Sequence, residues 1–135
     1  MALMTKLPFQ ERQQAQTEYI LVVDDMADNC FLLKTILEAE GYNVEVASNG
    51  TMALAKAEAL PPTLMLLDVM MPDMNGYEVT QRVRQSIKLA DLPVVLITAH
   101  DQESATLGKA VGANDFIRKP FDFDELLRQV RAYAT

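Results

Sequence analysis

Three aspartates, a threonine and a lysine stand where short apolar runs of this sequence end. Asp24 and Asp25 follow residues 19–23, Asp68 follows residues 64–67, Thr98 follows residues 94–97, and Lys119 follows residues 116–118. Carboxylates held close together repel one another unless a cation lies among them, and Mg²⁺ is a hard ion that prefers oxygen ligands. A carboxylate also forms acyl phosphates, and a hydroxyl and an ammonium can hold phosphoryl oxygens. The set therefore favours a site for a divalent cation and a phosphoryl group.

Such a site requires the four runs to be neighbouring strands of one sheet. Short apolar runs bounded by turn residues are typical of strands buried on both faces, as in parallel sheets. The carboxyl ends of parallel strands lie at one edge, and ligands bind there, where the strand order reverses. We therefore expect the five polar side chains to converge at that edge.

Helical patterns alternate with these strands along the chain. We expect a second strand at residues 43–46 and five helices, placed after the first strand (apolar positions 31–37), at 52–60, after Asn75 as N-cap, at 102–111, and around positions 126–130. Five strands alternating with five helices indicate an α/β fold, a three-layer sandwich with right-handed connections. The second strand offers no site residue, which suits an edge. The prediction is a flavodoxin-like, five-stranded parallel sheet of order 2-1-3-4-5 with five helices.

Length and composition agree with one folded domain. The chain has 135 residues, of which 50% are hydrophobic. Residues 1–18 are rich in glutamine without a clear period, so we expect an N-terminal extension, with a short helix as the alternative, ahead of a domain over residues 19–135. The net charge of -7 argues against direct nucleic-acid binding. No apolar run is long enough for a membrane span, and the single cysteine, Cys30, fits a reducing cytoplasm.

Each polar residue also has a simple structural explanation. Aspartates such as Asp24 and Asp25 often form turns or cap helices, Thr98 suits a strand, and Lys119 is compatible with a solvated strand end. Only the functional interpretation explains why all of them stand at strand ends. Asp68, which ends a different strand from the aspartate pair, is the best nucleophile of the set.

Longer motifs around these residues resemble one protein family. They are Val22-Val23-Asp24-Asp25, Asp68-Val69-Met70-Met71-Pro72-Asp73-Met74-Asn75-Gly76, Ile97-Thr98-Ala99, Gly112-Ala113-Asn114-Asp115 and Lys119-Pro120-Phe121. Residues 19–133 resemble the receiver domain of a bacterial two-component response regulator, similar to the chemotaxis regulator. No position that the family requires is missing.

The resemblance implies that Asp68 is the phosphoacceptor. It would take a phosphoryl group from a histidine kinase or a histidine phosphotransfer protein. Asp25, Asp68 and the backbone carbonyl of Met70 would bind Mg²⁺ directly, with Mn²⁺ as an alternative ion, and Asp24 would act through water. The domain would catalyse only its own phosphorylation and dephosphorylation.

The resemblance also implies how the signal leaves the site. Thr98 and Lys119 would hold the phosphoryl oxygens, and Phe116 stands at the position of the family's switch aromatic. The Lys119–Pro120 bond would be cis, which aims the lysine. Three positions would modulate the reaction, namely Met70, Ala99 and His100. Phosphorylation would alter the face formed by the fourth helix, fifth strand and fifth helix.

That face is also a candidate dimer interface. Lys109, Asp115 and Arg118 would pair across it, although solvated surface charge is the simpler fate for them. These motifs do not identify the downstream effector. Because the sequence stops after the last predicted helix, we expect either a stand-alone regulator or a receiver cut from a larger protein.

Two other functions compete with this interpretation. An aspartate-dependent phosphatase also forms an acyl phosphate, but such enzymes carry a second acid two residues after the nucleophile, where this chain has Met70. A pseudo-receiver used only for protein interaction normally has an eroded acid pocket, whereas Asp24, Asp25 and Asp68 are all present.

Overall fold

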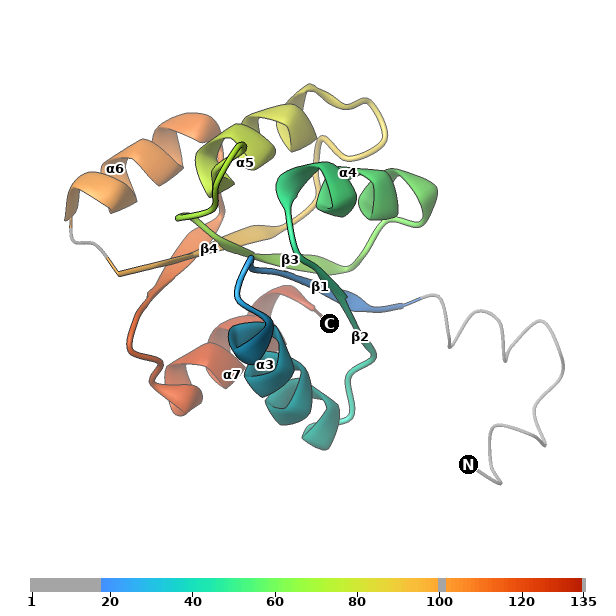
Figure 1. The fold of residues 1–135 in the computed structure, drawn as a ribbon, viewed down its shortest axis with the longest axis vertical. Coiled ribbons are helices and arrows are strands. Elements are labelled where there is room, and N and C mark those ends of the chain that lie inside the picture. Colours follow the sequence, from blue (N-terminus) through green and yellow to red (C-terminus); the bar gives the residue numbers. More distant parts are fainter. Residues whose placement is uncertain (1–17, 100–101, 135) are drawn as a thin grey trace, which may run out of the picture.

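The computed structural model describes residues 18–99 and 102–134, which form five parallel strands and five helices in strict alternation (Figure 1). The strands are β1 (Ile20–Val23), β2 (Val44–Ala47), β3 (Leu64–Asp68), β4 (Val94–Thr98) and β5 (Asp115–Arg118). The helices are α3 (Ala27–Ala39), α4 (Gly50–Ala59), α5 (Gly76–Gln85), α6 (Gln102–Val111) and α7 (Phe123–Tyr133). The sheet order is β2-β1-β3-β4-β5, which confirms the predicted flavodoxin-like order 2-1-3-4-5. The expected extension, apart from Glu18, lies outside the described residues.

The strand register brings the predicted polar residues to one edge of the sheet. Val23 at the end of β1 is level with Leu67, so Asp24 and Asp68 directly follow paired positions. Asp68 is level with Ile97, and Thr98 is level with Arg118, the residue before Lys119. All strands are parallel, so these ends meet at the same edge, as the apolar runs predicted.

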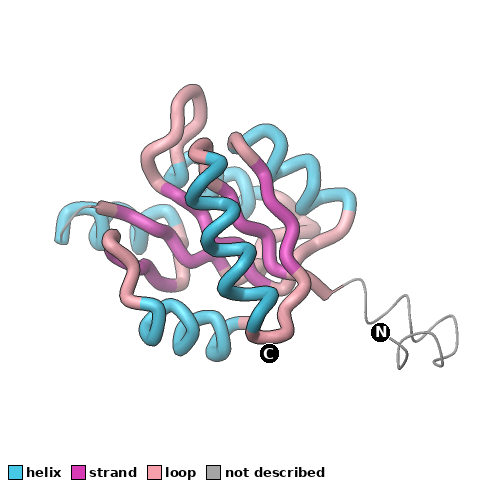
Figure 2. The backbone as a smooth tube through the Cα atoms, turned by 60° about the horizontal axis from the view of Figure 1, so that its bottom comes forward, coloured by secondary structure: helices cyan, strands magenta, loops and turns pink. Residues whose placement is uncertain are grey.

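Helices cover both faces of the sheet (Figures 1 and 2). The helices α3 and α7 lie on one face, and α4, α5 and α6 lie on the other. Alternate residues of each strand enter opposite cores: Leu21 and Leu67 pack on one side, whereas Val22 and Leu66 pack on the other. Burial on both faces is the physical reason why these strands are apolar without alternation.

Asparagine and aspartate side chains start three of the helices. Asn75 accepts a hydrogen bond from the backbone N–H of Glu78, which confirms it as the N-cap of α5. Asn49 caps α4 in the same way, so this helix begins at Gly50 rather than at Met52 as predicted. Asp122 caps α7. Such caps satisfy N–H groups that have no partner within the helix.

One arginine joins two loops at the other end of the sheet, the loop between α5 and β4 and the loop between α6 and β5. Arg84 of α5 donates from Nε to the carbonyl of Gly112 (2.9 Å) and from its terminal nitrogens to the carbonyl of Leu92 (2.6 Å) and to Oδ1 of Asn114 (2.8 Å). Burial lowers the pKa of this guanidinium. Gly112 has φ +97°, which favours glycine. The C-terminal end of α6 and the start of β5 are therefore fixed against α5.

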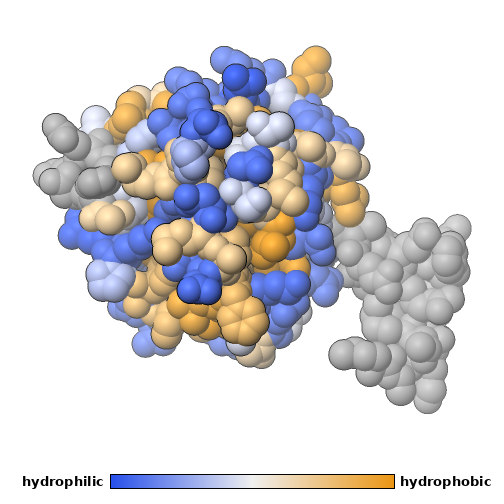
Figure 3. Space-filling view, viewed as in Figure 1, coloured by the Kyte–Doolittle hydropathy of each residue, from blue (hydrophilic) through white to orange (hydrophobic). Residues whose placement is uncertain are grey.

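Polar side chains occupy much of the face that Figure 3 shows, with apolar ones between them. The most exposed large apolar residues include Phe31 (73%), Met70 (63%) and Ile87 (101%). None of the described helices has both the length and the apolar content that crossing a membrane requires.

Candidate functional site

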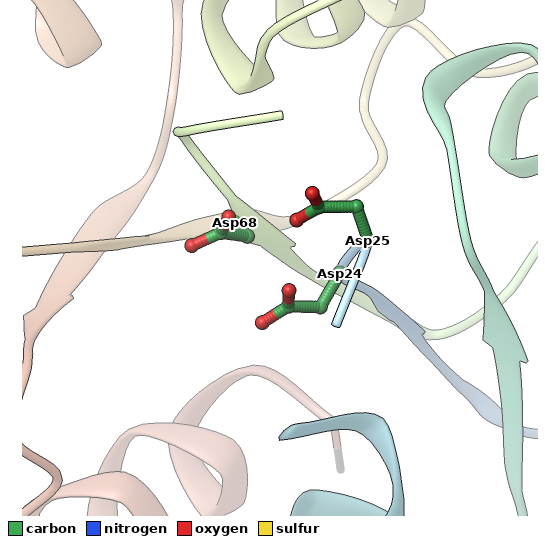
Figure 4. A group of neighbouring side chains, drawn as sticks. All are labelled: Asp24, Asp25 and Asp68. Carbon is green, nitrogen blue, oxygen red and sulfur yellow. The ribbon is translucent and has the colours of Figure 1, made fainter. Parts of the chain in front are cut away.

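Three carboxylates meet at the carboxyl edge of the sheet (Figure 4). Asp24 and Asp25 follow β1, and Asp68 ends β3; one oxygen from each lies within 4.8 Å of the others. Figure 4 shows their carboxylates pointing to the same side. Asp24 and Asp68 are each 2% exposed, whereas Asp25 is exposed. This arrangement brings together the predicted acids and leaves one of them open to solvent.

Lys119 extends from the end of β5 into this cluster. Its Nζ donates to Oδ1 of Asp68 at 2.8 Å and lies 4.0 Å from Oδ2 of Asp24. Its backbone N–H donates to the carbonyl of Thr98 at 2.8 Å, which ties the lysine to the end of β4. The peptide bond between Lys119 and Pro120 is cis, the geometry that the resemblance implied. The ammonium thus contacts the predicted nucleophile directly.

Asp68 lies in an environment that works against its charge. Burial raises the pKa of its carboxyl group, and the charges of Asp24 and Asp25 raise it further. The hydrogen bond from Lys119 lowers it, which only partly offsets these effects. A cation placed among the three carboxylates would relieve the repulsion, so the cluster is suited to a divalent ion.

Asp24 is held by the start of α3. Its Oδ1 accepts from the backbone N–H of Met26 at 2.9 Å, and its Oδ2 accepts from Nδ2 of Asn29 at 3.0 Å. Its backbone carbonyl accepts from Sγ of Cys30 at 3.3 Å, and burial raises the pKa of that thiol. Our sequence analysis missed Asn29. Its position in the first turn of a helix that starts beside the aspartate pair was the available signal.

The loop after Asp68 folds back closely on the strand. A Cβ on Gly76 would lie 2.6 Å from the carbonyl oxygen of Asp68, so glycine is required there by close approach. The N–H of Gly76 also donates to the carbonyl of Val69 at 2.9 Å. Within this loop Met70 is 63% exposed, whereas Met71 is buried. The loop therefore presents Met70 at the surface beside the acids.

The remaining predicted positions surround the site unequally. Thr98 is 4% exposed, and Ala99, directly after it, is exposed. Phe116 is half-buried against the core beneath α4, α5 and α6. The carbonyl of Phe116 accepts from Nε2 of Gln129, a buried residue that our sequence analysis also missed. His100 lies outside the described residues.

These groups together can perform nucleophilic chemistry on a phosphoryl group. A carboxylate is available at Asp68, an ammonium lies against it at Lys119, and two further acids complete a cluster that suits a divalent ion. Charge neutralisation and positioning are what phosphoryl transfer requires of a protein.

Comparisons with known proteins agree with this geometry. Residues 20–131 match the family model of the response regulator receiver domain. The chain is 40% identical over 114 residues to the DNA-binding dual master transcriptional regulator RpaA of Synechocystis, which covers 84% of this chain and 47% of that protein. The chain spans about half the length of the first curated relatives, covering 47% and 50% of them.

Solved structures show the same fold. The chemotaxis response regulator CheY4 of Vibrio cholerae matches with a TM-score of 0.81 and 33% identity, covering 86% of this chain and 98% of that one. The receiver domain of the sensor histidine kinase PA1611 from Pseudomonas aeruginosa, which has a magnesium ion coordinated in its active site cleft, matches with a TM-score of 0.79 and 29% identity, covering 87% of this chain and 96% of that one. The chain belongs to the response regulator receiver domain family, whose function is phosphorylation-dependent signalling in two-component systems.

Proposed function

We propose that this domain is switched by transfer of a phosphoryl group from a phosphohistidine donor to Asp68. The observation that carries the proposal is the contact of Lys119 with Asp68 at 2.8 Å inside a cluster of three carboxylates. A buried carboxylate with an ammonium against it and two acids beside it is unusual as a purely structural arrangement, because the repulsion has no structural benefit.

Mg²⁺ is the cation that fits this cluster best, with Mn²⁺ as its substitute. Asp25 and Asp68 would bind it directly together with the Met70 carbonyl, and Asp24 would act through water. Support comes from the unequal environments of the acids: Asp25 is exposed, whereas both oxygens of Asp24 already accept hydrogen bonds. The ion would neutralise negative charge on the carboxylates and on the phosphoryl oxygens.

The chain's own residues account for the rest of the transfer. An oxygen of Asp68 forms a bond to phosphorus while the bond from phosphorus to the donor histidine nitrogen breaks, and the histidine leaves as neutral imidazole once its ring regains a proton. Lys119 moves its ammonium from Asp68 to the phosphoryl oxygens, and the hydroxyl of Thr98 donates to another. Attack of water on the acyl phosphate later restores Asp68, so the domain catalyses only its own modification and its reversal.

The phosphoryl group would act on the rest of the molecule through Thr98 and Phe116. These residues end or lie in neighbouring strands, β4 and β5, and Phe116 is only half-buried. Movement of the Thr98 hydroxyl toward the phosphoryl group leaves room for the ring, which would shift α6. Phosphorylation would thereby shift a pre-existing equilibrium between two conformations, which would differ on the face formed by α6, β5 and α7.

The signalling partners follow from this chemistry. Residues 19–135 would form the switching unit, which takes its phosphoryl group in the cytoplasm from a histidine kinase or a histidine phosphotransfer protein. The face of α6, β5 and α7 would meet the effector or a second copy of the chain. The exposed Ala99 and Met70 would set the rate of the reaction by their bulk and polarity near the acyl phosphate. His100, which follows Ala99 in the sequence, would also modulate it.

Intact-mass spectrometry tests the proposal. Acetyl phosphate and Mg²⁺ should add one phosphoryl group to the wild-type protein and none to Asp68→Asn. Asp73→Asn is a matched control, because Asp73 is an exposed aspartate in the adjoining loop and should not affect the modification. Equal modification of Asp68→Asn and wild type refutes the assignment, and many turnovers of phosphate esters would identify a phosphatase instead. No modification of any variant would favour a pure interaction module.

A further inference from the structure

The carboxylate of Asp24 is oriented by a neutral donor on α3. Nδ2 of Asn29 donates to Oδ2 at 3.0 Å, and the N–H of Met26 donates to Oδ1 at 2.9 Å. Asp24 is only 2% exposed, so bulk solvent has little access to its carboxylate. Asn29 itself is half-buried in the first turn of the helix. The side chain of Asn29 therefore controls one of the two oxygens of a buried member of the acid cluster.

The same oxygen is the one nearest to Lys119. Oδ2 of Asp24 lies 4.0 Å from Nζ of Lys119, whereas Oδ1 of Asp68 lies 2.8 Å from it. The two carboxylates compete for one ammonium, and a carboxylate without another donor is the stronger competitor. By donating to Oδ2, Asn29 satisfies Asp24 and leaves the ammonium on Asp68.

Asn29 also does this without adding charge. An arginine or lysine at this position would satisfy Asp24 equally well, but its positive charge would repel a divalent cation. A carboxamide keeps the full negative charge of Asp24, Asp25 and Asp68 available to the ion. A neutral carboxamide donor at position 29 is therefore suited to a cation site, in addition to any contribution that it makes to local stability.

We propose that Asn29 is a positioning residue of the phosphorylation site that acts through Asp24. It holds the Asp24 carboxylate where that group meets the ion through water, and it keeps Lys119 paired with the nucleophile. This inference rests on the proposed function. Partners that orient metal-site carboxylates typically contribute 10–100-fold to metal affinity or activity, and we expect an effect near the lower limit, about tenfold.

Two substitutions separate positioning from a general structural role. Asn29→Ala removes the donor and should weaken Mg²⁺ binding about tenfold. Asn29→Asp keeps the shape but replaces the donor by a fourth carboxylate, so it should bind Mg²⁺ at least as tightly as wild type. Both should be phosphorylated about tenfold more slowly at saturating Mg²⁺, because Lys119 is then drawn away from Asp68. A structural defect would not weaken Mg²⁺ binding in the alanine variant alone while slowing phosphorylation in both variants.

The experiment uses the full chain, with Thr35→Ala as control. Thr35 lies exposed on the same helix, and its hydroxyl donates to the Phe31 carbonyl one turn earlier. Calorimetric titration with Mg²⁺ gives the affinity, and intact-mass time courses with acetyl phosphate at saturating Mg²⁺ give the rate. If Asn29→Ala does not fold, Asn29→Asp carries the test through its rate.

The outcomes distinguish this inference from the proposed function. Should the wild-type protein neither bind Mg²⁺ nor accept a phosphoryl group, the proposed function fails. Should the wild-type protein do both, the positioning role is overturned by an Asn29→Ala affinity equal to that of Thr35→Ala, or by an Asn29→Asp rate equal to that of wild type.

Discussion

Replacing the nucleophile by its neutral isostere should stabilise the metal-free protein. Asp68→Asn keeps the size of a side chain that is 2% exposed but removes one of three clustered negative charges. The raised pKa of Asp68 has the same origin, since burial and the neighbouring acids disfavour its charged form. Folding therefore forces an unfavourable charge into this site, and the substitution removes it.

The magnitude follows from the distances. At an effective dielectric constant of about 20, carboxylates whose nearest oxygens lie within 4.8 Å of one another repel by at least about 3.5 kcal/mol, and an ammonium at 2.8 Å attracts by about 6 kcal/mol. The repulsion of Asp68 by Asp24 and Asp25, which solvent screening at the exposed Asp25 reduces, thus nearly cancels its attraction to Lys119. The cost of burying the charge is left over, and Lys119 retains Asp24 as a partner in the mutant. We expect Asp68→Asn to raise the free energy of unfolding by about 1–2 kcal/mol.

Mg²⁺ should reverse this order. A ligand at a concentration of 100 times its Kd stabilises the folded state by about 2.7 kcal/mol, and Asp68→Asn lacks one of the proposed direct ligands. Urea unfolding with EDTA and then with saturating Mg²⁺ measures both effects, with Asp73→Asn as control for removal of an exposed charge. The asparagine variant should be the more stable protein in EDTA and the less stable one in Mg²⁺.

Low pH provides an internal check in EDTA. A carboxyl group whose pKa is raised in the folded state favours folding when protonated, and this contribution is lost as the pH rises through the raised pKa. The advantage of Asp68→Asn should therefore be present at neutral pH and vanish below the ordinary aspartate pKa of about 3.9. If Asp68→Asn is less stable than wild type in EDTA at neutral pH, the electrostatic reasoning is wrong.

Three further predictions concern the metal, the arginine that joins the loops and the switch. Asp25→Ala should weaken Mg²⁺ binding more than Asp24→Ala, because the exposed Asp25 would be a direct ligand whereas Asp24 would act through water; equal losses in a calorimetric titration would contradict this ranking. Arg84→Lys should lower the free energy of urea unfolding by about 2–3 kcal/mol, because an ammonium cannot reach all the acceptors in both loops; a loss below about 0.5 kcal/mol would argue against that role. Thr98→Ala should still accept a phosphoryl group, although more slowly. On activation, its amide chemical shifts around Phe116 should change much less than those of wild type, because a coupling of about 1–3 kcal/mol between the phosphorylation site and Phe116 is lost. Changes equal to those of wild type would refute the switch.

The sheet and the acid cluster were predictable because their signals are local. Residues 64–67 are buried on both faces, and this burial imposes the unbroken apolar run from which β3 was predicted. Asp68 and Lys119 are 51 residues apart, yet both end strands of a parallel sheet, so topology alone brought them together. The start of α4 was predicted two residues late, because Gly50 lowered the helical signal although Asn49 is a good N-cap.

The contacts missed by the sequence analysis depend on side-chain direction. Arg84 was unremarkable on the polar side of a predicted helix, because its acceptors are mostly backbone carbonyls that no residue type reveals. Gln129 likewise donates to the carbonyl of Phe116. Asn29 was overlooked for the opposite reason, because asparagine early in a helix usually serves the backbone rather than another side chain.

The contact between Arg84 and Gly112 also sets the mechanics of α6. The helix spans Gln102–Val111, about 15 Å, and this arginine holds the residue that follows its C-terminal end against α5. Its other end lies nearer in the chain to Thr98, which ends β4. A rotation of α6 would therefore pivot near Gly112, and a turn of about 10° would carry the opposite end by about 2.6 Å over that length. The displacement of the helix would increase steadily toward the phosphorylation site. A partner that binds the first turn of α6 would therefore meet a larger displacement than one that binds its last turn.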